Sequence, residues 1–332
     1  MTPAAVEQAA IWVPVLLPVA GAVLIGLVGR WPNLRETATL ATAVTLFVLV
    51  SKLIGPVAAG ARPDLLLFEM MPGLSIRFTL EPLGALFAGV ASFLWIITSI
   101  YSIGYMRGHH EQHQTRFYVC FAIAIGSAIG VAFAGNMLTL FVFYEVLTFS
   151  TYPLVTHHET DEAKRGGRTY LGVLVFTSIA LQLPAIIWTW SLAGTLDFRP
   201  GGILAGTADP PLLAALLALY VFGIGKAAVM PFHRWLPAAM VAPTPVSALL
   251  HAVAVVKAGV FTVLKVTYFI FGLELTRALG SGELLMYAAA ITILIASLVA
   301  LRQDNLKLRL AYSTVSQLSY IVLGAMLANA WG

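Results

Sequence analysis

Long apolar runs separated by short polar stretches dominate the pattern of hydrophobic and polar residues along this chain. A helix needs about 20 residues to cross the roughly 30 Å hydrocarbon core of a bilayer. We expect ten runs to do so: 9–28, 37–54, 82–103, 117–134, 137–156, 170–193, 211–241, 246–271, 284–301 and 310–329. The pattern therefore predicts an all-α polytopic membrane protein with about ten transmembrane helices, the seventh of them discontinuous.

The only long stretch outside these runs is residues 55–80. Within it, the sequence DLLLFEMMPGLSIRFTL shows short alternation of the kind found in strands, on either side of Pro72 and Gly73. Proline and glycine together are typical of a tight turn between two strands. We expect a small β-hairpin lying on the membrane surface.

Composition excludes a soluble globular protein. Hydrophobic residues make up 59% of the 332 residues and charged residues 10%, and the mean hydropathy is +0.89. A net charge of +4 would suggest nucleic-acid binding in a soluble chain, but here the basic residues fall in short loops between apolar runs. Such residues determine topology, so we expect a lipid bilayer and no nucleic acid as a partner.

The distribution of lysine and arginine predicts the orientation. Loops after odd-numbered runs carry eleven basic residues, whereas loops after even-numbered runs carry five. Because cytoplasmic loops are enriched in lysine and arginine, the odd loops are expected in the cytoplasm and both termini outside, in the cell inner (plasma) membrane. The first run follows no basic segment and precedes no clear cleavage site, so we interpret it as a retained helix and not a signal peptide.

The residues that commonly hold cofactors are scarce. Cys120 is the single cysteine and lies inside an apolar run, so this chain alone cannot build an iron–sulfur site, and we expect no cofactor. His109, His110 and His113 cluster with Glu111 in a loop. Adjacent loop histidines rarely converge on one ion, so we expect no metal there.

Residues 223–257 depart most from a plain membrane helix. Lys226 lies in the apolar run ALYVFGIGKAAVM, where a charge at the bilayer centre costs at least about 3 kcal/mol. Four prolines then interrupt the run, at positions 231, 237, 243 and 245. Irregular backbone survives at membrane depth only when it is buried in protein or lines a watery cavity. We therefore predict an ion pathway built around a discontinuous helix.

Glu145, in the apolar run NMLTLFVFYEVLTFSTYPLV, is the expected partner of Lys226. Gly223 and Gly225 remove side chains beside the lysine, so a neighbouring helix can approach closely, and a glutamate on that neighbour could meet the lysine. The alternative is a protonated Glu145 hydrogen-bonded to Tyr144, to Thr148 or to a neighbouring helix.

Three further titratable residues follow along the eighth run: His251, Lys257 and Lys265. Burial and opposed charges shift the proton affinity of lysine and glutamate in opposite directions, and histidine titrates near neutrality, so these residue types suit a proton relay. Lys265 is nearer the helix end, where it either reaches the membrane surface or joins the relay. The hydroxyls and imidazole expected to satisfy the broken backbone belong to His233, Thr244 and Ser247.

Three segments resemble a known family. They are FVFYEVLTFSTYPLV, GIGKAAVMPFHRWLPAAMVAPTPVSALLHAVAVVKAGVF and DNLKLRLAYSTVSQLSY. They are similar to the antiporter-like, proton-translocating subunits of Mrp-type sodium/proton antiporters, respiratory complex I and membrane-bound hydrogenases. The resemblance spans about residues 65–329, and THHETDEAKRGGRTYL is closest to the D-type Mrp subunit.

The resemblance assigns roles to four residues. Glu145 and Lys226 match a glutamate–lysine pair that modulates proton affinity. His251 and Lys257 match the residues of a central axis that leads protons onward. The resemblance also implies that the charged loop at residues 161–168, in composition a solvated face, contacts another subunit.

The resemblance also implies a domain organisation. Family members have about fourteen helices, which form two inverted five-helix repeats. Residues 1–116 are then three N-terminal helices with the hairpin, 117–271 the complete first repeat in helices four to eight, and 272–332 the start of an incomplete second repeat. The remaining helices are expected from a separate chain, from a partner subunit, or from sequence removed from this one.

These patterns predict a proton-conducting subunit of a multi-subunit monovalent cation/proton antiporter. Its partners are other membrane subunits, protons and sodium. Alternatives are the antiporter-like subunit of a redox-driven complex of the complex I or hydrogenase type, a subunit of an inorganic-carbon uptake complex, and a structural anchor for other subunits. The chain itself shows no redox or hydrolytic chemistry, although it could belong to an NADH:quinone oxidoreductase-like enzyme.

Overall fold

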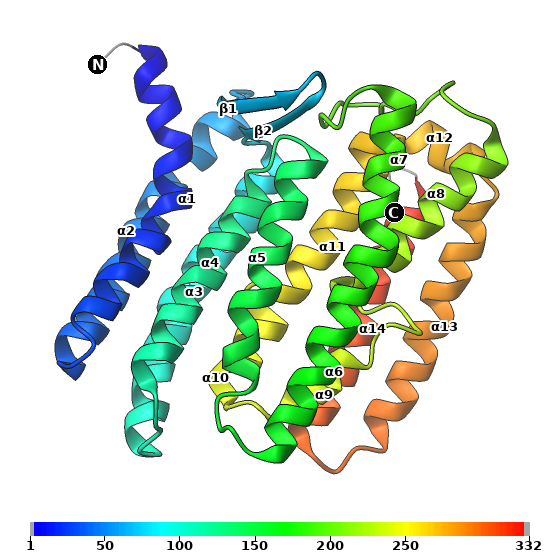
Figure 1. The fold of residues 1–332 in the computed structure, drawn as a ribbon. Coiled ribbons are helices and arrows are strands. Elements are labelled where there is room, and N and C mark those ends of the chain that lie inside the picture. Colours follow the sequence, from blue (N-terminus) through cyan, green and yellow to red (C-terminus); the bar gives the residue numbers. More distant parts are fainter. Residues whose placement is uncertain (1–2, 329–332) are drawn as a thin grey trace.

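The protein is a bundle of long helices with a small β-hairpin across one end (Figure 1). The computed structural model describes residues 3–328. The N-terminal helices are α1 (Pro3–Leu27), α2 (Pro32–Ala58), α3 (Pro82–Gly108) and α4 (Gln114–Ala132). The later long helices are α5 (Met137–Val155), α6 (Asp161–Thr177), α7 (Leu183–Ala193), α8 (Pro210–Gly223), α11 (Val255–Lys265), α13 (Ser281–Leu301) and α14 (Leu306–Leu327).

Membrane-spanning length and apolar composition are present in eight helices of the described chain. Two shorter apolar helices, Ile11–Leu27 and Pro210–Gly223, accompany them. The prediction of a polytopic all-α membrane protein is confirmed at this level. Every predicted apolar run contains helix, because a backbone in hydrocarbon must satisfy its own hydrogen bonds.

The predicted hairpin is present. Strand β1 (Asp64–Met71) pairs antiparallel with β2 (Leu74–Thr79) across a turn at Pro72 and Gly73. Gly73 has a φ of +75°, and a side chain there would collide with the carbonyl oxygen of Gly194 at the end of α7. The hairpin begins later than expected because α2 continues to Ala58.

Backbone hydrogen bonds fix the hairpin to the bundle. The Thr79 amide donates to the Phe133 carbonyl at 2.8 Å, and the Gly135 amide donates to the Arg77 carbonyl at 2.9 Å. Asn136 caps α5 and donates from Nδ2 to the Ser75 carbonyl at 2.7 Å. The hairpin therefore lies against the end of the bundle where α4 leads into α5.

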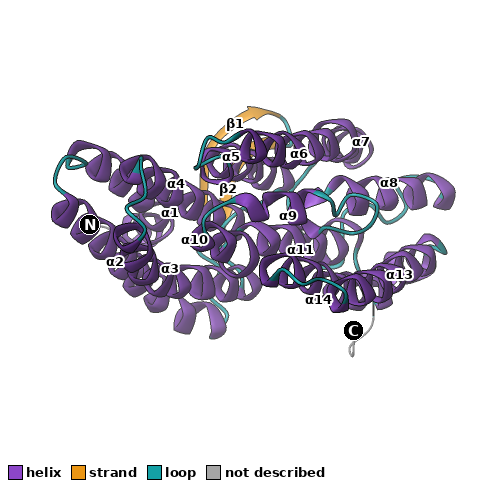
Figure 2. Cartoon of the chain, turned by 90° about the horizontal axis from the view of Figure 1, so that it is seen from below, coloured by secondary structure: helices purple, strands orange, loops and turns teal. Residues whose placement is uncertain are grey.

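Helix α11 is central in the bundle. Seen end-on, α1 to α4 form one side, and α11 lies among α9, α10 and α14 (Figure 2). Buried residues make up 83% of the apolar window in the segment Thr244–Phe271, against 28–72% in the other seven candidate spans. Side chains on α11 are therefore largely surrounded by protein.

The chain between α8 and α11 is a series of short pieces. They are a 3₁₀ turn (Gly225–Ala227), α9 (Trp235–Ala238), a 3₁₀ turn (Ala239–Val241), α10 (Thr244–Ala248) and a π-helical turn (Leu249–Val253). Proline lacks an amide hydrogen and clashes with a preceding carbonyl, so the prolines in this segment prevent a continuous helix. The remaining elements are π-helical turns at Ser178–Gln182 and Val266–Phe271, and α12 (Leu273–Ala278).

Side chains from distant positions satisfy the broken backbone. Trp235 Nε1 donates to the Gly225 carbonyl at 2.9 Å, the Met230 amide donates to Thr292 Oγ1 at 3.2 Å, and Lys307 Nζ donates to the Ala242 carbonyl at 2.9 Å. Ser247, which we expected in this role, has a buried hydroxyl without a partner among the described residues. The expectation for Ser247 is therefore wrong.

The charged run at residues 161–168 is the start of α6 and not a loop. Thr160 caps the helix, because its hydroxyl accepts a hydrogen bond from the Ala163 amide at 3.1 Å. Asp161 and Glu162 in the first turn interact favourably with the helix dipole. The charged residues of the run are nevertheless exposed, as the solvated-face interpretation predicted.

A buried ion pathway as the candidate functional site

Lys226 is fully buried in the 3₁₀ turn that follows α8. Its Nζ donates to the Tyr144 carbonyl at 2.8 Å and to Thr148 Oγ1 at 2.5 Å, and it lies 3.2 Å from the centroid of the Tyr144 ring. The Lys226 amide also donates to the Tyr144 hydroxyl at 3.1 Å. One turn of α5 therefore holds both the backbone and the ammonium of this lysine.

Glu145 lies in the same turn of α5, between the two residues that hold Lys226. Its side chain is half-buried, and neither carboxylate oxygen has a hydrogen-bond partner within the described chain. Tyr144 and Thr148 therefore do not satisfy Glu145, as the alternative interpretation proposed; they bind the lysine instead. The structure brings acid and ammonium to neighbouring positions without joining them.

The glycines beside Lys226 permit close packing, as predicted, but against a different helix. A Cβ at Gly223 would lie 2.5 Å from the Gln182 amide nitrogen, and one at Gly225 would collide with the Thr177 hydroxyl. These neighbours belong to α6 and the π-helical turn after it. The expectation that the closely packed neighbour carries Glu145 is wrong, because Glu145 is on α5.

His251 lies in the π-helical turn Leu249–Val253 and is 7% exposed. Its Nε2 is 3.1 Å from the sulfur of Met240, and its Nδ1 is buried without a partner in the described part of the chain. π-helical turns often occur at functional sites because they change the direction in which a side chain points. His251 makes no hydrogen bond to Lys226, so any proton passing between them needs water.

Lys257 is half-buried near the start of α11. Six residues separate it from His251, which corresponds to about 9 Å along a helix. The two side chains are therefore successive positions along one path and do not touch, as the sequence spacing predicted.

Lys265, at the end of α11, is fully buried. Its Nζ lies 2.9 Å from Glu81 Oε1, 4.3 Å from the ring centroid of Phe198 and 4.8 Å from that of Phe269. The interpretation that Lys265 reaches the membrane surface is wrong, because an ion pair and aromatic rings enclose its charge.

Glu81 was not identified from the sequence. It precedes Pro82 at the start of α3, where an acidic residue is common because it interacts with the helix dipole. No pattern near Glu81 distinguishes it from such a helix-start residue. Its partner lies in a distant part of the sequence, so only the fold reveals the pair.

The histidines of the loop after α3 gather with two histidines from the loop after α5. His109, His110 and His113 line a pocket of about 240 Å³ with His157 and His158. Glu111 Oε2 lies 3.6 Å from His157 Nε2 and 3.6 Å from His158 Nδ1. Burial lowers the pKa of His157 to about 4, and the positive charge of Arg116 adds to this effect.

Comparison with known families now identifies the group to which this bundle belongs. Residues 134–332 match the family model described as NADH:quinone oxidoreductase/Mrp antiporter, TM. The chain belongs to this family. Residues 71–118 also match the model for the N-terminus of chain 5 of NADH-ubiquinone oxidoreductase (complex I), so the predicted resemblance to antiporter-like subunits is confirmed.

Curated relatives of this antiporter family are named as antiporter subunits. The chain is 33% identical over 263 residues to the putative antiporter subunit mnhA2 of Staphylococcus epidermidis, covering 76% of this chain and 31% of that protein. It is 33% identical over 262 residues to a Na(+)/H(+) antiporter subunit of Alkalihalophilus pseudofirmus, with the same coverage of both proteins. It is 32% identical over 289 residues to a probable K(+)/H(+) antiporter subunit of Rhizobium meliloti, covering 85% of this chain and 28% of that protein. The chain thus spans about a third of the length of these relatives, and the D-type assignment stays a prediction.

Solved structures share the fold of this family member. A chain of the Mrp complex from Dietzia sp. DQ12-45-1b superimposes with a TM-score of 0.83 at 24% identity, over 98% of this chain and 59% of that one. A chain of the membrane-bound sulfane sulfur reductase, an archaeal respiratory membrane complex, gives 0.82 at 24% identity, over 96% and 64%. Both belong to membrane complexes, and at this identity they establish the fold alone.

Proposed function

We propose that this chain is a proton-conducting subunit of a multi-subunit monovalent cation/proton antiporter. Protons would move through Glu145, Lys226, His251 and Lys257. The observation that carries this proposal is the fully buried ammonium of Lys226, which one turn of α5 holds beside the unpaired carboxylate of Glu145.

The arrangement around Lys226 suits a switch of proton affinity. A neighbouring carboxylate favours the ammonium form of a buried lysine, whereas separation from it favours release of the proton. The carbonyl of Tyr144 and the hydroxyl of Thr148 are neutral acceptors, so they hold the lysine apart from Glu145 without compensating a full charge. Movement of one side chain toward the other would join the pair and retain the proton.

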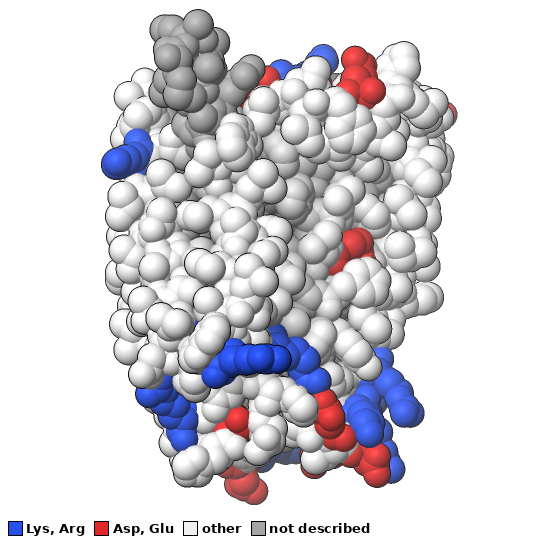
Figure 3. Space-filling view, turned by 60° about the vertical axis from the view of Figure 1, so that its left-hand side comes forward, with Lys and Arg blue, Asp and Glu red and all other residues white. Residues whose placement is uncertain are grey.

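The orientation and organisation of the chain form part of this proposal. On the face shown in Figure 3, lysine and arginine side chains gather toward one end, below a broad band that is largely free of charge. This asymmetry supports a cytoplasmic location for that end and an outer location for the hairpin end, in the cell inner membrane. Residues 117–271 would form the first antiporter repeat, and residues 272–332 would begin the second.

An antiporter is favoured over a redox-driven complex by the names of the curated relatives, which are Na(+)/H(+) and K(+)/H(+) antiporter subunits. Other membrane subunits are the proposed partners, because the solved neighbours come from multi-subunit membrane complexes. Mass spectrometry of the native complex separates the two assignments. Iron–sulfur or flavin subunits among the co-purifying chains would reject the antiporter assignment.

The relay is tested in membrane vesicles that contain the complete complex. Sodium-dependent proton exchange, followed with a pH-sensitive dye, is expected to fall roughly 100-fold or more in Glu145→Ala and in Lys226→Ala, with assembly intact. Glu283→Ala and Lys52→Ala remove the same charges from exposed positions of α13 and α2 and should retain normal exchange. Unchanged exchange in both relay variants would reject the proposal.

A further inference from the structure

Glu81 and Lys265 form a buried ion pair near the hairpin end of the bundle. Glu81 is 9% exposed and Lys265 is fully buried. Glu81 Oε1 lies 2.9 Å from the lysine ammonium, whereas Oε2 is buried without a hydrogen-bond partner in the described chain. A buried ion pair that serves only stability usually has its remaining lone pairs satisfied. The free oxygen of Glu81 therefore needs another explanation.

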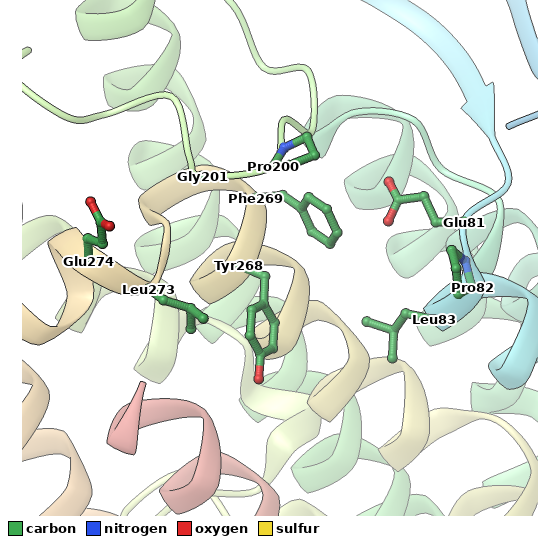
Figure 4. Close-up of a pocket in the computed structure, with 9 residues that line it drawn as sticks. All are labelled: Glu81, Pro82, Leu83, Pro200, Gly201, Tyr268, Phe269, Leu273 and Glu274. Carbon is green, nitrogen blue, oxygen red and sulfur yellow. The ribbon is translucent and has the colours of Figure 1, made fainter. Parts of the chain in front are cut away.

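Two cavities meet at Glu81. The larger, of about 700 Å³, extends past Tyr268 and Phe269 to Glu274 on its opposite rim. In Figure 4 the carboxylate of Glu81 points across this cavity toward the ring of Phe269. The walls of the larger cavity are mainly apolar, because prolines, leucines and aromatic residues line it. It supplies space beside the carboxylate but few polar partners.

The second cavity, of about 400 Å³, is lined by charged groups. Apart from Glu81, its charged residues are Arg62, Asp64, Arg77, Asp197 and Arg199. A polar cavity of this size is large enough to hold ordered water. Its three arginines and two aspartates leave a net positive charge around Glu81, which favours the ionised form of that carboxyl group.

Helix α11 connects this pair to the proposed relay. Lys257 lies eight residues before Lys265, which is about 12 Å along the helix axis. The titratable residues of α11 therefore lead from the buried centre of the bundle to Glu81. Beyond Glu81 lies the charged cavity, under the hairpin.

We propose that Glu81 and Lys265 form the proton-exchange site at which the buried relay meets water on the hairpin side of the bundle. This inference rests on the proposed function of the relay. The ammonium of Lys265 gives a proton to the carboxylate of Glu81, which leaves a neutral amine and a carboxylic acid. Glu81 releases that proton to water in the charged cavity, and Lys265 takes up another from Lys257 through water. One proton enters and one leaves, and no electrons move.

The test compares variants that remove titration with a matched control. In vesicles holding the complete complex, Glu81→Gln is expected to slow cation-dependent proton exchange roughly tenfold or more. It should also flatten the dependence of the rate on the pH of the compartment facing the hairpin. Glu81→Asp keeps a titratable group and should keep the pH dependence. Glu274→Gln makes the same change on the opposite rim of the larger cavity and should exchange normally.

Lys265→Arg separates exchange from a structural ion pair. Arginine keeps the positive charge and the pairing with Glu81, but it stays protonated, so a relay is blocked while a structural pair is preserved. We expect exchange to fall as in Glu81→Gln, with normal amounts of assembled complex. Normal exchange in Lys265→Arg would overturn the inference. If Lys226→Ala is inactive in the same assay, the proposed relay still stands; if Lys226→Ala is also active, the proposed function fails.

Discussion

Lys226 and Lys265 are both fully buried lysines, yet their charges are compensated in different ways. Lys226 is held by a carbonyl, a hydroxyl and an aromatic ring, all of them neutral. Lys265 is held by the carboxylate of Glu81 and by aromatic rings. In one region the nearby acid is separated from the lysine, and in the other it is paired.

The comparison shows one protein with both arrangements that a buried acid–lysine switch requires. A separated pair favours proton release by lysine, and a joined pair favours proton retention. The backbone differs in parallel, because Lys226 lies in a short 3₁₀ turn of a broken segment, whereas Lys265 ends a regular helix. We infer that the turn at Lys226 is the more easily rearranged of the two regions.

The largest expected difference between the two lysines is in stability. Removal of one partner from a buried ion pair leaves an uncompensated charge and typically costs about 3–5 kcal/mol. Lys265→Met should therefore lower the free energy of unfolding by about that amount. Lys226→Met leaves only neutral acceptors unpaired and should cost about 1–3 kcal/mol. Denaturant titration of the purified protein in detergent measures both values.

The double variant Glu81→Gln/Lys265→Met provides the control for this difference. With both charges removed, no unpaired charge stays buried, so most of the stability lost in Lys265→Met should return. Equal losses in Lys265→Met and Lys226→Met would contradict the distinction between a paired and an unpaired lysine.

The sequence was sufficient to predict the helical bundle, the hairpin and the residues around Lys226. Bilayer thickness sets the length of apolar runs, and a charge within such a run is costly, so both features are visible without a structure. The hairpin was predictable because Pro72 and Gly73 interrupt an alternating segment.

The partners of these residues were not predictable. Tyr144 and Thr148 were expected near Glu145, but they bind Lys226 because the choice depends on where the broken segment lies. Glu81 meets Lys265 only when the start of α3 packs near the end of α11. The start of α6 is a different case, because Thr160 followed by acidic residues is a helix-start signal that the density of charge obscured.

A third buried basic group, His157, tests the same physics outside the membrane. Its pKa is lowered to about 4 by burial, so the folded state excludes a proton that the unfolded chain binds below about pH 6.5. Stability should be constant above pH 6.5 and fall by about 3 kcal/mol as the pH drops to 4. Unfolding curves across this range measure the loss.

His157→Gln should remove most of this pH dependence, whereas His158→Gln, at the exposed neighbouring position, should retain it. Equal pH dependence in the two variants would show that His157 does not carry the effect. It would also weaken the use of burial alone to explain how the two lysines differ.

The smallest expected effect concerns how α11 fixes the turn at Lys226. A Cβ at Gly259 would collide with the backbone of Lys226 and Ala227, which cannot move aside as a flexible side chain would. Gly259→Ala should therefore cost about 1–3 kcal/mol and slow proton exchange, because it displaces the lysine from α5. Gly172→Ala, where no atom lies within 4 Å of the new Cβ, should change stability by less than about 0.5 kcal/mol. Equal behaviour of the two variants would mean that α11, which carries Lys265, does not also position Lys226, and the two lysine regions would then be mechanically independent.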